Sequence, residues 1–328
     1  MIQGHQNTPG TELAPVKPPQ AGGNASPLWY VGVALSVLVI GWYPFLGVML
    51  LAGVTRILVD RSGPRAFVGA VLVAIATVVI LSVTFGLSSG LVAVPPLLTT
   101  LLLVACMCRG AAGVTSVSTV VAVGTLASLA IDAFTLSGQG YSVADVTCGL
   151  LMETVRASAG NGIDANMVVA TVEPVVTALW PLVYVMTVMV NVLGAGVGAL
   201  VAAPRVNGVR HLPQIARFDA PLWSVGVLAL SVLGLGASFA GIPYANVVLT
   251  VSATVLMSVR FIFAAQGLGV LSDKLSRLRM GCMLRPLIIC FAVWVEAMSF
   301  ILSIVGLIDV WANFRKLPRG GTDAETHR

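Results

Sequence analysis

Two ionisable residues of opposite charge, Arg260 and Glu296, lie inside long apolar stretches of the sequence. Arg260 lies about halfway along its stretch, in LMSVRFIFAAQG, and Glu296 lies near the middle of its own, in CFAVWVEAMSF. Charged side chains at bilayer depth are costly, so they are usually paired or functional. We predict that the two meet as an interhelical pair, either as a buried structural salt bridge or as a polar site that binds a solute headgroup. An Arg260 that snorkels to the membrane interface is the third alternative.

Three further polar residues are candidates for the lining of such a site. Glu173 directly precedes Pro174, so it is either a pore-facing acid or the start of a helix, where an acid is favourable. Asn191 and Gln266 lie in apolar stretches, where an amide side chain hydrogen-bonds across helices. We interpret both amides as links between helices and as a possible polar lining.

The sequence lacks a convincing enzyme motif. It contains neither HExxH nor GxxxxGK[ST], and GLSSG at 86–90 matches GxSxG only by letter, because that motif requires a strand-to-helix elbow. The five cysteines show no metal-ligand spacing, and the histidines lie in the tails and one loop (His5, His211, His327). We therefore predict no catalytic residues, no metal and no cofactor.

The composition predicts that lipid surrounds most of the chain. Hydrophobic residues make up 57% and charged residues 9%, and the mean hydropathy is +0.97. Soluble domains carry about 25% charged residues. Because the apolar stretches are continuous rather than alternating, we predict an all-α, polytopic transmembrane bundle and not a barrel.

Eight apolar runs predict about eight spans. They cover approximately 28–59, 66–85, 91–107, 114–133, 175–203, 222–240, 247–271 and 287–310. Pro44 interrupts the first run, which is therefore either one kinked helix or two short segments. Around this core we predict a disordered tail (1–27), N-terminal membrane helices (28–133), an extracytoplasmic segment with a short amphipathic helix (134–172), C-terminal membrane helices (173–312) and a basic tail (313–328).

Basic residues in the connections predict the orientation. The clusters at 56–65, 109, 205–217 and 274–285 fall at every second connection, so all should face the cytoplasm. A final run that crossed once would place Arg315, Lys316 and Arg319 outside, against this rule. A broken or re-entrant last segment would return them to the cytoplasm. Asp309, at the end of that run, is close enough to the basic cluster to pair with it.

Several stretches resemble the bacterial YybS-like membrane proteins, a family of unknown function. They are ALWPLVYVMTVMVNVLGAGVGAL, FDAPLW, AAQGLGVLSDKL and GLIDVWANFRKL, together with YPFLGVMLLAGVTRILVDRSGPRAFVGAVLVA near the start. The last of these is also loosely similar to the substrate-binding subunits of energy-coupling-factor transporters. The resemblance implies a multi-pass protein of the bacterial plasma membrane and does not supply a reaction.

These observations predict a transport-related membrane protein that binds a small solute within its helical bundle. The alternative is a membrane scaffold or regulatory protein that acts through partner helices and cytoplasmic loops. The expected partners are the lipid bilayer, a small-molecule solute and a partner membrane protein or ATPase, because no nucleotide-binding loop is present. Nucleic acid is not expected, because the basic residues are spread over membrane-flanking clusters.

Overall fold

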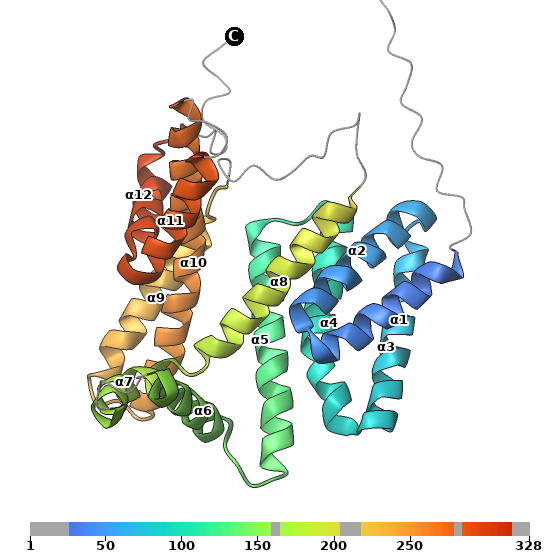
Figure 1. The fold of residues 1–328 in the computed structure, drawn as a ribbon. Coiled ribbons are helices and arrows are strands. Elements are labelled where there is room, and N and C mark those ends of the chain that lie inside the picture. The colour runs from blue at the N-terminus through green and yellow to red at the C-terminus, as the bar shows by residue number, and fades with distance from the viewer. Residues whose placement is uncertain (1–25, 159–164, 204–217, 279–283, 317–328) are drawn as a thin grey trace, which may run out of the picture.

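The chain is all α-helical over the part that the structure describes. The computed structural model describes residues 26–158, 165–203, 218–278 and 284–316, which fold into twelve α-helices and no strand (Figure 1). The helices are α1 (Pro27–Trp42), α2 (Pro44–Ser62), α3 (Arg65–Phe85), α4 (Leu87–Cys108), α5 (Val114–Ser137), α6 (Val143–Ser158), α7 (Ala165–Leu179), α8 (Leu182–Ala202), α9 (Leu222–Ser238), α10 (Ala245–Arg277), α11 (Leu284–Ser299) and α12 (Ile301–Ala312). Nearly all of the predicted 1–27 tail, the 205–217 loop and most of the C-terminal tail lie outside these ranges. The all-α fold class is confirmed for the described residues.

Five helices are long and apolar enough to cross a membrane, namely α3, α4, α5, α8 and α10. The count becomes six if the bent pair α11–α12 is taken as one span. Only 11% of the most apolar window of α5 is buried inside the protein, so most of its side chains are at least partly exposed. These helices indicate a multi-pass membrane protein. The predicted count of eight is not confirmed, because α1 and α9 are shorter and the first and last runs are each broken into two helices.

The first apolar run forms a helical hairpin. Tyr43 separates α1 from α2, and Pro44 opens α2 at a position where its missing N–H costs nothing. A Cβ added at Gly32 in α1 would lie 3.2 Å from Val54, towards the end of α2. The two helices therefore lie antiparallel, which decides between the two predicted alternatives in favour of two short segments.

The last apolar run is also broken. The axes of α11 and α12 differ in direction by 98°, and the residue between them, Phe300, has a left-handed backbone (φ 58°). Such a conformation is strained for a bulky L-residue, so the surrounding contacts must hold it. After the bend, α12 packs along α10, and the C-terminal end of α12 lies at the same end of the bundle as that of α10 (Figure 1).

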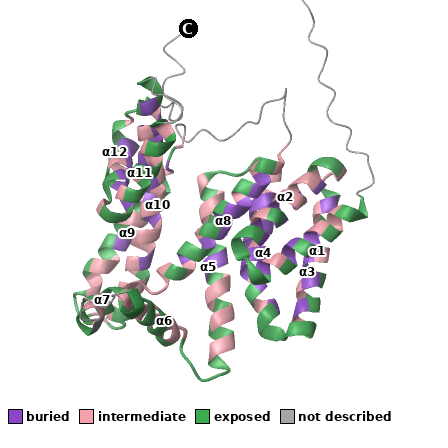
Figure 2. Cartoon of the chain, viewed as in Figure 1, coloured by how far each residue is buried: buried purple, intermediate pink, exposed green. Residues whose placement is uncertain are grey.

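The buried apolar side chains form two clusters. The larger cluster is formed by six helices, α1, α2, α3, α4, α5 and α8. Members such as Val33, Leu51 and Val104 are fully buried. The smaller one joins α9, α10 and α12 to the segment that precedes α9, around Phe263. Figure 2 shows the buried residues concentrated along the interior of each group, with exposed and intermediate residues on the outward faces. This arrangement suits helices surrounded by lipid.

The described parts of the basic connections lie at one end of the bundle. The α2–α3 and α4–α5 connections, the last turn of α10 and the end of α12 all lie at the upper end in Figure 1. The α3–α4 and α9–α10 turns and the helices α6 and α7 lie at the lower end. The broken last run thus brings Lys316 to the same end as the other basic groups, as the orientation rule requires.

The helices around the predicted 134–172 segment begin and end at other residues than its predicted bounds. Helix α5 extends to Ser137, and the predicted amphipathic helix is α6. A further helix, α7, begins at Ala165 and ends at Leu179, so the predicted run 175–203 is divided at Trp180–Pro181. Hydropathy alone missed this break because both sides of it are apolar.

A labelling experiment tests this end-to-end arrangement. In a cysteine-free background, Arg109→Cys and Lys316→Cys should react together with a membrane-impermeant maleimide, and Gly138→Cys should react only from the opposite side. All three positions are exposed in the structure. Labelling would be compared in sealed right-side-out and inverted vesicles. If Lys316→Cys followed Gly138→Cys instead, the re-entrant path of α11 and α12 would be wrong.

Candidate functional site

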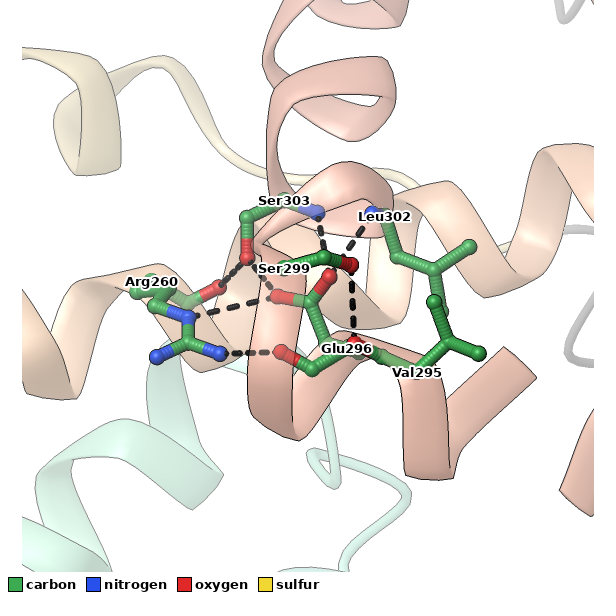
Figure 3. Close-up of polar contacts among 6 residues, drawn as sticks. All are labelled: Arg260, Val295, Glu296, Ser299, Leu302 and Ser303. Carbon is green, nitrogen blue, oxygen red and sulfur yellow. Dashed lines mark hydrogen bonds and ion pairs between the residues drawn. The ribbon is translucent and has the colours of Figure 1, made fainter. Parts of the chain in front are cut away.

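Arg260 and Glu296 are in direct contact (Figure 3). Arg260 lies in the middle of α10, and its Nε donates to Glu296 Oε1 at 3.2 Å. Its Nη2 donates to the backbone carbonyl of Glu296 at 2.6 Å. The side chains are 17% and 9% exposed, so the pair is largely shielded from its surroundings. The structure therefore brings together the two residues that the sequence predicted to meet.

The pair also closes the break between α11 and α12. Glu296 Oε2 accepts hydrogen bonds from the backbone N–H groups of Leu302 at 2.7 Å and Ser303 at 3.3 Å, and the Ser303 hydroxyl donates to Oε1. The carboxylate thus caps the first turn of α12, where a negative charge is favourable. Arg260 correspondingly binds a carbonyl in the last turn of α11, where a positive charge is favourable. These contacts favour the structural interpretation of the pair.

The two hydrogen bonds to Glu296 use Nε and Nη2 of Arg260, so its Nη1 is not bonded to Glu296. Its guanidinium lies 3.7 Å from the centroid of the Phe300 ring, and the residue lines a small cavity of about 220 Å³ with otherwise mostly apolar walls. Glu296 does not line this cavity. A solute site formed by both charges is therefore not what the geometry offers.

A second buried polar cluster lies further along α10, and the sequence did not predict it as a unit. Gln266 is fully buried and donates from Nε2 to Asp309 Oδ2 at 2.8 Å. Asp309 forms a salt bridge with Arg315 at 2.8 Å, and these side chains are 0% and 1% exposed. The pairing of Asp309 with the basic cluster follows the sequence pattern, but its complete burial does not. Gln266 thus links helices within this cluster, about 9 Å along α10 from Arg260, and does not line a site with it.

The other predicted polar residues lie apart from both clusters. Glu173 is exposed in the interior of α7, which begins at Ala165, so the predicted helix start at this acid is wrong. Asn191 is buried in α8, three residues before Gly194, which packs against Phe45 of α2. Neither residue is brought near Arg260 or Glu296.

A hollow in the described part of the chain lies between the two groups of helices. It has a volume of about 930 Å³ and is lined by α5, α8, α10 and residues around the start of α9. Its described lining is apolar with interspersed hydroxyls (Thr115, Ser118, Thr119, Thr125, Thr254, Ser258) and contains no ionisable side chain. Binding sites for small molecules have this size and this mixture of groups.

One hydroxyl in this lining has no partner. The Thr254 Oγ1 atom is buried and makes no hydrogen bond within the described part of the chain, and the residue is 9% exposed. An unsatisfied buried polar group costs about 1–3 kcal/mol. Thr254 therefore carries a hydroxyl that the described part of the chain leaves unsatisfied. Because the lining hydroxyls come from apolar runs and no motif marks them, sequence reasoning missed this site.

No family model, curated protein or solved structure matches the chain. The resemblance to the YybS-like and energy-coupling-factor families therefore stays a prediction. Within the described ranges no group of three or more His, Cys, Asp or Glu side chains could hold a metal ion. What the arrangement offers is a large uncharged cavity beside an internally neutralised charge pair.

Proposed function

We propose that the protein is a transport-related protein of the bacterial plasma membrane that binds a small uncharged solute in the 930 Å³ cavity between α5, α8, α9 and α10. The cavity carries this proposal. An uncharged lining in a low-dielectric environment disfavours an ionic solute, whose desolvation would not be compensated. The hydroxyls of the lining provide hydrogen bonds to fix a neutral polar group.

The location of the cavity supports a transport role over a purely structural one. It lies between the two groups of helices, each with its own apolar cluster. Around the cavity, the indole N–H of Trp223 bridges the groups by donating to Thr115 Oγ1 at 3.1 Å. Movement of one group against the other would open or close the cavity, as in transporters with a site at the interface of two bundles. Energy would come from a partner ATPase or an ion gradient, and the basic end of the bundle would face the cytoplasm.

A thermal-shift experiment with matched compounds tests the proposal. The purified protein in nanodiscs would be heated with riboflavin or riboflavin 5′-phosphate, and with nicotinamide or nicotinate. Each pair differs mainly in charge, so an uncharged lining should give a rise in Tm with a neutral member and none with its charged partner. If no neutral compound stabilises the protein, the scaffold alternative gains support.

A cavity-filling substitution locates the binding. Ala122 in α5 is exposed and lines the cavity, so Ala122→Phe should abolish the Tm rise by occupying the solute volume. Ala130→Phe is the matched control, because Ala130 is exposed on the same helix and lies outside the cavity lining. Equal loss of the Tm rise in both variants would contradict the proposed location.

A further inference from the structure

The segment that leads into α9 is held by side chains from outside it. The backbone N–H of Ala220 donates to Gln266 Oε1 at 2.9 Å. Two residues earlier, the carbonyl of Phe218 accepts a hydrogen bond from Arg315 Nη1 at 2.7 Å. Gln266 belongs to α10, and Arg315 follows the end of α12. Gln266 Nε2 also donates to Asp219 Oδ1 at 3.3 Å. Residues remote in the sequence therefore hold two backbone groups and one side chain of this short segment.

The same segment forms part of the cavity wall. Phe218 and Trp223 both line the 930 Å³ cavity, and Trp223 also contacts Thr115 of α5. A displacement of Phe218 or of the first turn of α9 would therefore change the shape of the cavity directly. Neither Arg315 nor Gln266 lines the cavity itself.

Asp309 fixes both of the side chains that hold this segment. Its Oδ2 accepts from Gln266 Nε2 at 2.8 Å and from Arg315 Nη2 at 2.8 Å. A buried ion pair is an expensive way to attach a helix, since apolar packing of similar volume is often as stabilising or more so. What the ion pair adds is direction, because a planar guanidinium can bind a carboxylate and a carbonyl at once in a fixed geometry.

We infer that Arg315 and Gln266 are positioning residues of the solute cavity, so that the C-terminal end of α12 sets the position of the wall formed by Phe218 and Trp223. The inference rests on the proposed function, because the position of this wall matters for binding only if a solute occupies the cavity. It goes beyond that function by assigning a role in binding to a part of the chain that does not touch the solute.

The test uses the full-length protein in nanodiscs and a double substitution, Asp309→Asn with Arg315→Gln. Removing both charges avoids an unpaired buried charge, and glutamine is too short to reach the Phe218 carbonyl. The control is Asp273→Asn with Arg277→Gln, which makes the same two substitutions at an Asp–Arg pair of α10 whose side chains are 23% and 59% exposed. Arg315→Lys, which keeps the charge beside Asp309, is the second test variant.

Two measurements separate this inference from the proposed function. The first, without any solute, is acrylamide quenching of Trp223, obtained as the difference between each protein and its Trp223→Phe form. Quenching should rise in the double variant, rise less in Arg315→Lys and stay unchanged in the control. The second is riboflavin affinity, which should weaken by about tenfold, the equivalent of one lost well-placed contact, in the double variant only.

The outcomes are distinguishable. If the wild type binds neither riboflavin nor nicotinamide but quenching changes as expected, the positioning role stands and the proposed ligand class fails. If the double variant folds with wild-type quenching and affinity, the inference is overturned. Should the double variant not fold, unchanged quenching in Arg315→Lys would overturn it equally.

Discussion

Replacing Gly306 with alanine should detach α12 from α10 and destabilise the protein by about 3 kcal/mol or more. A Cβ at Gly306 would overlap the carbonyl oxygen of Phe263 and lie 2.7 Å from the backbone nitrogen of Gly267. Gly267, on the facing side of this contact, has no room for a side chain either, because an added Cβ would overlap the carbonyl of Leu302. Overpacking against side chains costs typically about 1–3 kcal/mol, and here the obstacle is backbone, which cannot rotate away.

The damage should extend beyond the clash. The close approach of the two backbones lies between the Arg260–Glu296 pair and the Asp309–Arg315 pair, so a displaced α12 would stretch the contacts of both. Breaking a buried charge pair is itself strongly destabilising. The measurement is the free energy of unfolding in detergent. Acrylamide quenching of Trp223 should also rise if α12 separates from α9.

Gly226→Ala provides the control for the Gly306 prediction. Gly226 lies in α9 with nothing within 4 Å of an added Cβ, so alanine should be neutral or slightly stabilising through its higher helix propensity. A Gly306→Ala protein as stable as Gly226→Ala would show that α10 and α12 are not in backbone contact.

The main features of the fold could be predicted from hydropathy, but the breaks in the first and last apolar runs could not. Runs such as 66–85 and 114–133 correspond closely to α3 and α5, because one apolar stretch of this length has one stable form in lipid. The last run is as apolar as these, yet it bends by 98° at Phe300. Its turn depends on Glu296 and Arg260 stabilising the two helix ends, and such tertiary contacts leave no trace in an average of hydropathy.

The sequence predicted a polar contact only where a charged residue lies in an apolar run, because burying an unpaired charge costs free energy. Arg260 and Glu296 stand out because a charge in an apolar run needs a partner, and each was the obvious partner of the other. Arg315 gave no such signal, since a basic residue after an apolar run is expected at a membrane surface. The cavity gave none either, because hydroxyl residues such as Thr254 and Ser258 are ordinary in spanning helices. Their role emerges only when α5 and α10 lie on opposite walls of one hollow.

The broken helix explains why the charge pair and the 930 Å³ cavity are separate. Transporters with discontinuous helices commonly direct a helix N-terminus at an anionic substrate. Here the N-terminus of α12 is already occupied by the carboxylate of Glu296. The chain's own side chain takes the place that a substrate anion would need, so an ionic solute has no comparable site there. The open volume instead lies on the other face of α10, which carries Thr254, Ser258 and Ile262.

A double-mutant cycle on Arg260 and Glu296 should show a large coupling energy. Glu296→Gln and Arg260→Gln should each cost about 3–5 kcal/mol, because each leaves a buried charge without its counter-charge. The double substitution should cost less than the sum of the singles by about 2 kcal/mol, since no unpaired charge is left. The cycle would be measured as free energies of unfolding in one detergent. The control cycle is Asp273→Asn and Arg277→Gln, an exposed pair whose coupling should stay below about 0.5 kcal/mol. Strict additivity at Arg260 and Glu296 would mean that their contact does not join α11 and α12 to α10.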